Sequence, residues 1–255
     1  MIRFKIDGFV IRGFSMGETS RIVTIYSRQK GKLKCVGKGA QKSATLKGIG
    51  LELFSHVECY IHRKENVELG TISSIDLLND YSTLAADPLK FGYGSAFCEI
   101  IDKFTTNDEP ITELFELSGE FFDEIEQCRT EMAAAIFWAA FLKALGHLGY
   151  RPQLYSCAIC GKSNKGRAAY YDVARGGIIC SKDALPEVQH GKLTAAGLRS
   201  LQQCLELPLP QIANLNPSAK ILGEIEQFVI SFAKYHTGLH RDLKSFKFLS
   251  QLKRR

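Results

Sequence analysis

Apolar and polar residues alternate through the first part of the chain, and the apolar residues then follow helical spacing. The stretches 5–17, 21–40 and 51–78 contain short apolar or β-branched runs that end at glycines or polar turns. A glycine-containing turn at residues 29–31 separates two of these runs, as in a hairpin. Five short strands within the first 80 residues predict a small barrel, and the OB-fold is the commonest barrel with that number of strands.

Helical spacing begins near residue 84. In segment 109–128, leucine, phenylalanine and isoleucine recur three or four residues apart, with acidic residues on the other side. Segment 131–150 is apolar nearly all round, which predicts a buried central helix. Gly238 is placed to end a later helix. Further helices are predicted in segments 87–104, 194–207, 218–238 and 243–252.

These patterns predict an α+β, multidomain protein. An OB-fold domain is expected in residues 1–80, a helical domain in 81–150 and 191–255, and a zinc-finger-like cysteine loop in 151–190 between its two parts. The N-terminus has no apolar region typical of a signal peptide, and the longest apolar stretch, Met132 to Leu142, is too short to span a bilayer. A cytosolic protein without a membrane partner is therefore expected.

Charge is segregated along the chain, although the net charge is only +6. No acidic residue lies between Glu18 and Glu52, whereas this interval holds eight lysines and arginines. The last 22 residues are also basic, and residues 108–131 carry nine carboxylates against one arginine. Such segregation indicates a polyanionic partner for one face, with simple solvation by lysines as the alternative.

Cations on a barrel of this type commonly neutralise the phosphates of a nucleic-acid strand. About five phosphate contacts on a single strand would make log affinity fall with log salt at a slope of about −3.5. Phe14 and Tyr26 are nearby aromatic residues that could stack on bases, although their alternation with polar residues favours the core. The residues expected to contact a nucleic-acid strand, DNA or RNA on charge alone, are Arg21, Arg28, Lys32, Lys34, Lys38, Lys42, Lys47, Arg241, Lys244 and Lys247.

A metal site is predicted in the cysteine loop. Cys157 and Cys160 form a Cys-x-x-Cys pair, which supplies two zinc ligands from one tight turn. Cys180 follows, and Asp183 occupies the register of a missing fourth thiol. Because zinc also accepts carboxylate oxygen, these four residues are predicted to form a structural Zn²⁺ site.

Two alternatives to this zinc site stay open. Three cysteines could act with another ligand, such as His190 or Cys204, or the loop could keep its fold without metal. Redox catalysis ranks lower, because no thioredoxin-like pattern surrounds the cysteine pair. The other cysteines stand alone in apolar or helical contexts and are expected to be buried: Cys35, Cys59, Cys98, Cys128 and Cys204.

Known catalytic motifs are absent from the sequence. Lys42 and Ser43 lack the two glycines that a nucleotide-binding P-loop requires. The six histidines are scattered, and no nucleophile or metalloprotease motif is present. The chain is therefore not expected to be an enzyme.

Several segments carry a family resemblance. The stretches "GETSRIVTIYSRQKGKLKCVGKGAQK", "LGYRPQLYSCAICG", "GGIICSKDA" and "YHTGLHRDLKSFKFL" occur in the same order as in RecO, a family of bacterial recombination mediators and strand-annealing proteins. The likeness runs from about residue 6 to residue 250. It implies an N-terminal OB-fold, a helical domain and, in some members, a zinc finger of four cysteines, from which this chain departs at Asp183.

The resemblance also implies function and partners. It implies binding to single- and double-stranded DNA and annealing of strands coated with single-strand-binding protein. It further implies contact with the acidic C-terminal tail of that protein, partnership with RecR, and a link to RecA loading near the bacterial nucleoid. A zinc-ribbon RNA-binding or transcription accessory protein is the main alternative, and a scaffold for an acidic protein is another.

Overall fold

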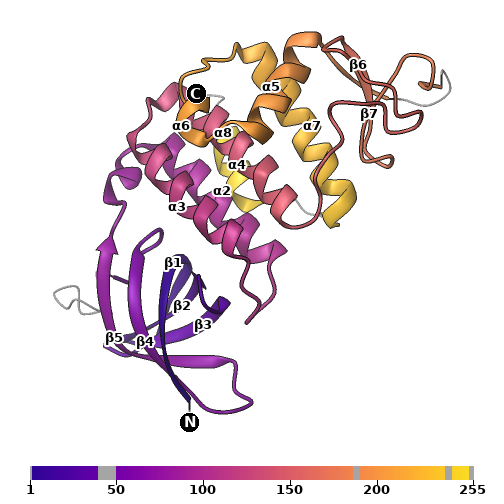
Figure 1. Ribbon diagram of the computed structural model, residues 1–255. Coiled ribbons are helices and arrows are strands. Elements are labelled where there is room, and N and C mark those ends of the chain that lie inside the picture. Colours follow the sequence, from indigo (N-terminus) through magenta and orange to yellow (C-terminus); the bar gives the residue numbers. More distant parts are fainter. Residues whose placement is uncertain (1, 40–49, 186–189, 239–242, 253–255) are drawn as a thin grey trace. The chain divides into compact units, whose positions relative to one another are not determined.

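The computed structural model of the chain divides into two compact units (Figure 1). Unit 1 consists of Met1–Glu126 together with Leu243–Arg255, and unit 2 is the intervening Gln127–Asp242. The chain thus leaves unit 1, forms unit 2 and returns to unit 1. The four-part division expected from the sequence stays a prediction. The structure describes residues 2–39, 50–185, 190–238 and 243–252.

Five N-terminal strands close into a barrel with the order β1-β2-β3-β5-β4. Neighbouring strands are antiparallel except β3 and β5, which run parallel. The prediction of a five-stranded N-terminal sheet followed by helices is confirmed. The strands are β1 (Ile2–Met16), β2 (Ser20–Ser27), β3 (Gly31–Gly37), β4 (His56–Arg63) and β5 (Leu69–Asn79).

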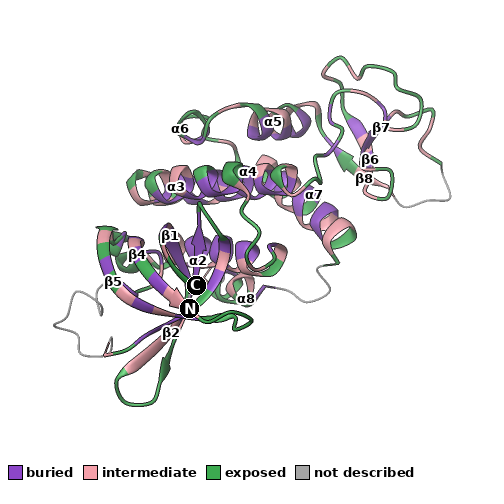
Figure 2. Ribbon diagram, turned by 60° about the horizontal axis from the view of Figure 1, so that its bottom comes forward, coloured by how far each residue is buried: buried purple, intermediate pink, exposed green. Residues whose placement is uncertain are grey.

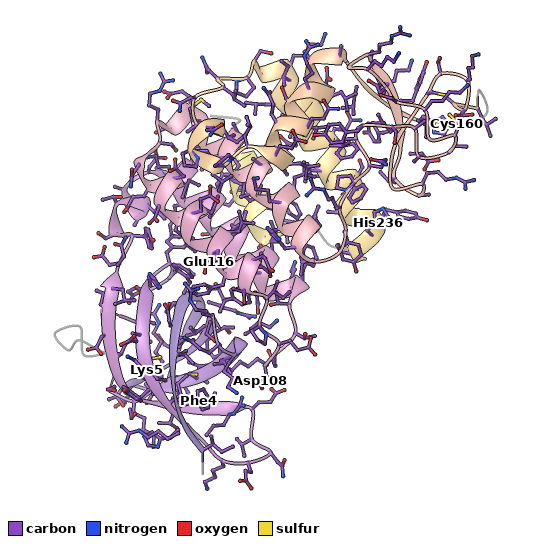
Figure 3. The ribbon with its side chains drawn as sticks, viewed as in Figure 1. Phe4, Lys5, Asp108, Glu116, Cys160 and His236 are labelled. Atoms are coloured by element: carbon purple, nitrogen blue, oxygen red, sulfur yellow. The ribbon has the colours of Figure 1, made fainter. Side chains whose placement is uncertain are left out.

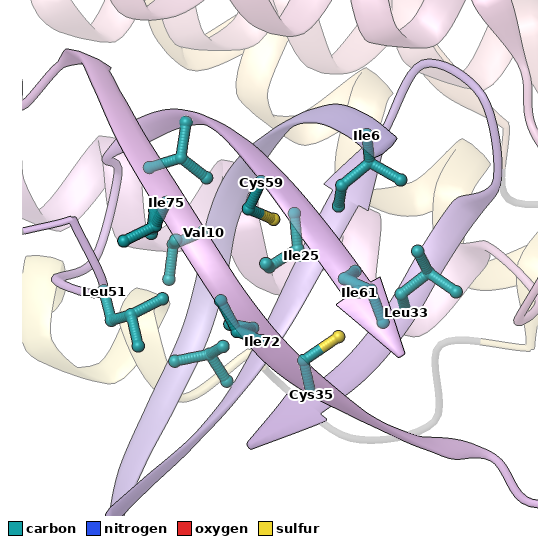
Figure 4. Packing of buried hydrophobic residues seen from close by; sticks show 12 residues of the cluster. Ile6, Val10, Ile25, Leu33, Cys35, Leu51, Cys59, Ile61, Ile72 and Ile75 are labelled. Carbon is teal, nitrogen blue, oxygen red and sulfur yellow. The ribbon is translucent and has the colours of Figure 1, made fainter. Parts of the chain in front are cut away.

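Small aliphatic side chains fill the inside of the barrel (Figure 4). Most of them come from alternate positions of the strands, because successive strand residues point to opposite faces, and Leu51 precedes β4. Burying each such side chain contributes about 1.5–3 kcal/mol relative to leaving it exposed. The cluster comprises Ile6, Val10, Val23, Ile25, Leu33, Cys35, Leu51, Val57, Cys59, Ile61, Ile72 and Ile75.

The turn between β2 and β3 depends on a glycine. Gly31 has a φ of 60°, in the left-handed region that glycine adopts without strain. A Cβ atom at this position would also collide with the backbone carbonyl of Glu109. The hairpin predicted at residues 29–31 is therefore confirmed, and it packs closely against the segment that precedes the second long helix of unit 1.

Among its described residues, unit 1 also contains three α-helices: α2 (Pro88–Phe104), α3 (Thr112–Gln127) and α8 (Lys244–Leu252). A short 3₁₀ helix, η1 (Ser82–Ala86), precedes them. Helix α8 packs on α2 at Gly92, where a Cβ atom would lie only 2.6 Å from Cδ2 of Leu249. The carboxylate of Glu99 on α2 accepts hydrogen bonds from the backbone amides at the start of α8.

Unit 2 is built around helix α4 (Ala133–His147), which follows the 3₁₀ turn η2 (Thr130–Met132). Helix α4 is buried along most of its length (Figure 2), so the predicted central helix is confirmed. Gly238 ends α7 with a φ of 65°, as predicted. The other helices of unit 2 are α5 (Ala195–Glu206), α6 (Leu209–Ile212) and α7 (Ala219–Thr237).

The cysteine-bearing part of unit 2 contains a small sheet that the sequence patterns did not predict. Its strands, β6 (Ala169–Asp172), β7 (Gly177–Ile179) and β8 (Gly191–Leu193), pair antiparallel in the order β7-β6-β8. Strands of three or four residues are too short to give a recognisable alternation. None of the helices in the described part of the chain is long and apolar enough to cross a lipid bilayer.

Candidate functional site

Two of the arginines predicted to contact DNA are engaged with acidic residues of unit 1. Arg21 on β2 forms an ion pair with Glu52. Arg28, just after β2, pairs with Glu116 of α3 and lies 3.4 Å from the carboxylate of Asp7. These pairs are partly exposed and therefore of modest strength, but they reduce the positive charge that the sequence alone assigns to this surface.

The lysines of β3 are partly neutralised in the same way. Lys32 is only 12% exposed, its Nζ lies 3.5 Å from the Asp102 carboxylate, and it also donates to the Asp102 backbone carbonyl. Lys34 lies 3.6 Å from the carboxylate of Glu68, and both of these side chains are well exposed. Lys32 is therefore held against α2, whereas Lys34 can exchange its partner for a phosphate at little cost.

Three predicted residues remain exposed without an ion pair among the described residues: Lys38, Lys244 and Lys247. Lys38 follows β3, whereas Lys244 and Lys247 lie on α8. Because α8 belongs to unit 1, Lys244 and Lys247 lie in the same compact unit as Lys38. The predicted contacts Lys42, Lys47 and Arg241 lie outside the described residues.

The two candidate stacking residues differ in exposure. Phe14, on the part of β1 paired with the start of β2, is 50% exposed. Tyr26 is fully buried, and its hydroxyl donates to the carbonyl of Ile111 at 3.3 Å. Burial raises the pKa of Tyr26 to about 12. Tyr26 is therefore part of the core, as its alternation favoured, and Phe14 alone is accessible to a base.

The sequence patterns did not predict a further exposed aromatic residue, which has cations beside it. Tyr60 on β4 is 37% exposed and lies opposite Lys5 of β1. Arg3 and Lys5 lie 5.2 Å and 5.9 Å from the centroid of its ring. Figure 3 labels Lys5 on the barrel. Arg3 and Lys5 alternate with apolar residues, and this alternation could have indicated two cations on one face of a strand. It precedes the acid-free run between Glu18 and Glu52, from which the basic surface was predicted.

The predicted metal ligands meet in the cysteine-bearing part of unit 2. The sulfur atoms of Cys157, Cys160 and Cys180 and a carboxylate oxygen of Asp183 all lie within 4.8 Å of one another. The sulfur atoms of Cys160 and Cys180 are 3.9 Å apart. Oδ2 of Asp183 accepts from the thiols of Cys157 and Cys180 at 3.1 Å and 2.9 Å. The alternative ligands His190 and Cys204 are not members of this cluster.

The surroundings of the cluster favour negative charge on Cys157 and Asp183 but not on Cys160. Partial burial raises the pKa of the Cys157 thiol, but backbone amides, including that of Cys180 at 3.3 Å from the sulfur, together hold this pKa below its ordinary value. The thiol hydrogen bonds, that of Cys160 foremost, lower the pKa of Asp183 to about 2. The same interaction with Asp183 raises the pKa of Cys160 to about 11.

These four donors fit a zinc ion in their chemistry and spacing. Two sulfur atoms bound tetrahedrally at about 2.3 Å from zinc would be about 3.8 Å apart, close to the 3.9 Å between Cys160 and Cys180. The thiol-to-carboxylate distances of 3.1 Å and 2.9 Å are shorter than the roughly 3.6 Å that the same geometry gives for sulfur and oxygen, so Asp183 would move outward around an ion. The cluster is therefore suited to hold a metal, and zinc is the ion that a set of three thiols and one carboxylate favours.

Buried cysteines elsewhere differ sharply from this cluster. Cys35 and Cys59 lie inside the barrel, Cys98 on α2 and Cys204 on α5. Burial raises the pKa of each of these thiols, to about 12 for Cys59 and Cys204. They act as small apolar side chains, as predicted. Cys128 is only half-buried, so its predicted burial is partial.

Family comparisons divide the chain where the barrel ends. The family described as "Recombination protein O N terminal" matches residues 1–81, and "Recombination protein O C terminal" matches residues 85–245. Both families describe a protein of recombination. The chain belongs to the RecO family, so the resemblance seen in its sequence is confirmed and places it in DNA repair and recombination.

Similar proteins span nearly the whole chain. A "DNA repair protein RecO" from Desulforamulus reducens is 27% identical over 98% of this chain and 94% of its own length. The protein of that name from Desulfitobacterium hafniense strain DCB-2 is 29% identical over 88% of this chain and 83% of its own length. A third, from Pelotomaculum thermopropionicum, is 27% identical over 97% of this chain and 94% of its own length.

Proposed function

We propose that the chain binds single- and double-stranded DNA through exposed cations of unit 1 and anneals complementary strands as a recombination mediator. One observation carries this proposal. Lys38 follows the barrel strand β3, and Lys244 and Lys247 come from the far end of the sequence, yet all three are exposed in the same compact unit without an ion pair among the described residues. Cations of this kind are free to contact phosphates.

Other cations of unit 1 could also contact DNA, but they must first release acidic partners. Lys34 and Arg28 are partly exposed and can release their acidic partners to a polyanion. Arg21 and Lys32, more enclosed, support the barrel instead. The strand order, with its parallel β3–β5 pair, supports the assignment as an OB-fold, a barrel that frequently carries single strands.

Annealing on this surface requires no covalent step. Cations bound to the phosphates of two strands lower their mutual repulsion until pairing nucleates, and base pairing then supplies the sequence specificity. The protein consequently needs neither a catalytic group nor a turnover cofactor, in line with the expectation that it is not an enzyme. Exposed Phe14 is placed to stack on an unpaired base, which would hold a strand open for pairing.

Partners follow from family membership as proposals. RecR, the acidic tail of single-strand-binding protein and a functional link to RecA are those that the resemblance implies, within a bacterial cytosol. We assign no residues to them.

The cysteine cluster is proposed to hold a structural zinc ion through Cys157, Cys160, Cys180 and Asp183. When bound, zinc would tie the turn after Cys157 to the turn after Cys180. The chain's own residues prepare this arrangement, because the backbone amide of Cys180 already donates to the sulfur of Cys157. The site has no role in annealing chemistry beyond keeping this part of unit 2 folded.

A strand-annealing assay tests the proposed function. Two complementary labelled oligonucleotides are coated with single-strand-binding protein and mixed with the chain across a salt series. Wild-type protein is expected to accelerate pairing, with an effect that fades as salt rises. The triple variant Lys38→Gln/Lys244→Gln/Lys247→Gln should bind free strands more weakly, with a salt slope shallower by about 2.

A matched control carries Arg129→Gln, Arg199→Gln and Lys220→Gln, which remove three exposed cations of unit 2. The control should behave as wild type. Equal losses in both variants would leave only a general charge effect. Tight binding without any acceleration, or a preference for RNA, would instead favour the RNA-binding alternative.

A further inference from the structure

An open cavity of about 670 Å³ lies in the cysteine-bearing part of unit 2. The small sheet β7-β6-β8 forms one wall, where Ile178, Ile179 and Leu193 contribute apolar surface. The turn after Cys160 and the N-terminal end of α5 form other parts of the lining. A cavity of this volume is in the range that holds a small ligand or one unit of a polymer.

The cations around this cavity are not neutralised. Lys162, Arg167, Lys182 and Lys192 all line it, and none of them forms an ion pair with another described residue. The one acidic residue in the lining is Glu224 of α7. Its Oε2 accepts at 2.9 Å from both the backbone amide and the hydroxyl of Thr194, so this carboxylate already caps the start of α5.

Two further groups in the lining are suited to a nucleobase. Oδ1 of Asn164 is buried and accepts no hydrogen bond within the described part of the chain, so a donor on a ligand would satisfy it. The half-buried ring of Tyr170 also lines the cavity, with Nζ of Lys192 5.4 Å from its centroid. An aromatic face beside a cation is the arrangement on which bases stack next to their phosphates.

We propose that this cavity binds one nucleotide of a single DNA strand, with the base against Tyr170 and the phosphates at Lys162, Arg167, Lys182 and Lys192. The proposal extends the proposed DNA binding to a second surface, in unit 2, and rests on it for the identity of the polyanion. Cations, a hydrogen-bond acceptor and an aromatic ring together match a nucleotide, which offers phosphate, N–H donors and a flat base. An acidic peptide would use the cations but not the aromatic face.

Two cations of the cavity can be replaced without changing any residue of the metal cluster, so the proposal can be tested in the whole chain. Arg167 and Lys192 lie well away in sequence from Cys157, Cys160, Cys180 and Asp183, so their replacement leaves the ligands intact. The variant Arg167→Gln/Lys192→Gln removes two cavity cations. The matched control, Lys165→Gln/Arg175→Gln, removes two exposed cations of the same region that do not line the cavity.

Fluorescence anisotropy with a short labelled oligothymidine measures the result. The cavity variant is expected to lose affinity by about tenfold at low salt, since two solvent-exposed charge contacts disappear. Its salt slope should be shallower by about 1.4. The control should match wild type, and equal losses in the two variants, or no loss in the cavity variant, would overturn the proposal.

Photocrosslinking provides a second readout that does not depend on overall affinity. An oligonucleotide with 5-iodouracil should crosslink to Tyr170, and the cavity variant should lose this crosslink. Crosslinks confined to unit 1 would overturn the inference. Displacement of the probe by an acidic oligopeptide as effectively as by unlabelled oligothymidine would also overturn it, in favour of a peptide site.

The two DNA proposals fail in distinguishable ways. If the unit 1 variant Lys38→Gln/Lys244→Gln/Lys247→Gln loses binding while the cavity variant does not, the proposed function stands and the cavity inference falls. If none of the chain's variants changes binding because the wild type does not bind DNA, both fall together.

Discussion

The barrel and the cysteine-bearing part of unit 2 use their cations in opposite ways. The barrel has the denser run of lysines and arginines in the sequence, yet Arg21, Arg28, Lys32 and Lys34 all face acidic partners. Around the cavity in unit 2, four cations occur without any comparable run, and none has an ion pair among the described residues. Charge density along a chain is therefore a poor guide to the charge available to a ligand.

The difference arises from contacts between distant parts of the sequence. Asp102 of α2 and Glu116 of α3 follow the barrel by many residues and neutralise it after folding. The cavity has one carboxylate in its lining, and that carboxylate is occupied by Thr194. The two regions also differ in what stabilises them, because the barrel has a large aliphatic core, whereas the small sheet buries fewer side chains, such as Tyr171 against Phe228, and has the cysteine cluster beside it.

Removing barrel core tests the difference in stabilisation and should have the largest effect. Ile61→Ala empties a fully buried position and is expected to lower the free energy of unfolding by about 2–5 kcal/mol. Ile159→Ala, at a half-exposed position beside the cysteine cluster, should change it by about 0.5 kcal/mol or less. Urea unfolding followed by circular dichroism measures both. Similar losses would mean that the two regions do not differ in this way.

Changing the metal cluster tests whether bound zinc stabilises the cysteine-bearing part of unit 2. Cys157→Ser should abolish zinc in metal analysis of the purified protein and make the segment around the cluster susceptible to protease, because two turns lose their tie. Asp183→Cys completes four thiolates and should retain zinc at chelator concentrations that strip the wild type. Equal, near-zero zinc in the wild type and Cys157→Ser would remove the zinc proposal.

Removing an acidic partner of the barrel cations would make them available to DNA, as the cations around the cavity are. Asp102 lies 3.2 Å from Nη1 of Arg12 and 3.5 Å from Nζ of Lys32. Asp102→Asn should therefore raise DNA affinity by a few-fold and steepen the salt slope by about 0.7 for each cation that reaches a phosphate. Glu65→Gln removes an exposed carboxylate without an ion pair among the described residues and serves as the control. Equal changes in both variants would indicate net charge alone.

A small pH effect is expected where α8 joins unit 1. Burial raises the pKa of Glu99, but hydrogen bonds from the amides of Ser245 and Lys244 outweigh it and hold this pKa below its ordinary value. A depressed carboxyl pKa adds stability that is present above the unfolded value and is lost as pH falls through the folded one, here below about pH 4. Hydrogen exchange of α8 amides in wild type and Glu99→Gln measures it. An identical pH response in both would contradict the assignment.

Short sequence patterns predicted most helices and strands of this fold, but they did not predict which distant elements contact one another. Alternation identified the five barrel strands but not the short strands β6, β7 and β8, and the Cys-x-x-Cys spacing with the register of Asp183 identified the cluster. The parallel pairing of β3 with β5 and the ion pair of Lys32 with Asp102 join distant segments, so no short window contains them. Phe14 and Tyr26 had the same alternation, yet Phe14 is 50% exposed, whereas Tyr26 is fully buried and its hydroxyl donates to the carbonyl of the distant Ile111.

The return of the chain to unit 1 fixes an order of events during translation. Residues 127–242 leave the ribosome before α8, so unit 2 is complete while α2 still lacks the helix that packs at Gly92. At about 5–20 residues per second, the nascent chain spends several seconds with that face of α2 uncovered. Chains that stall within unit 2 would display it permanently, as a surface for chaperones or proteases. Docking of α8 is thus a step that only chains translated through residue 252 can take.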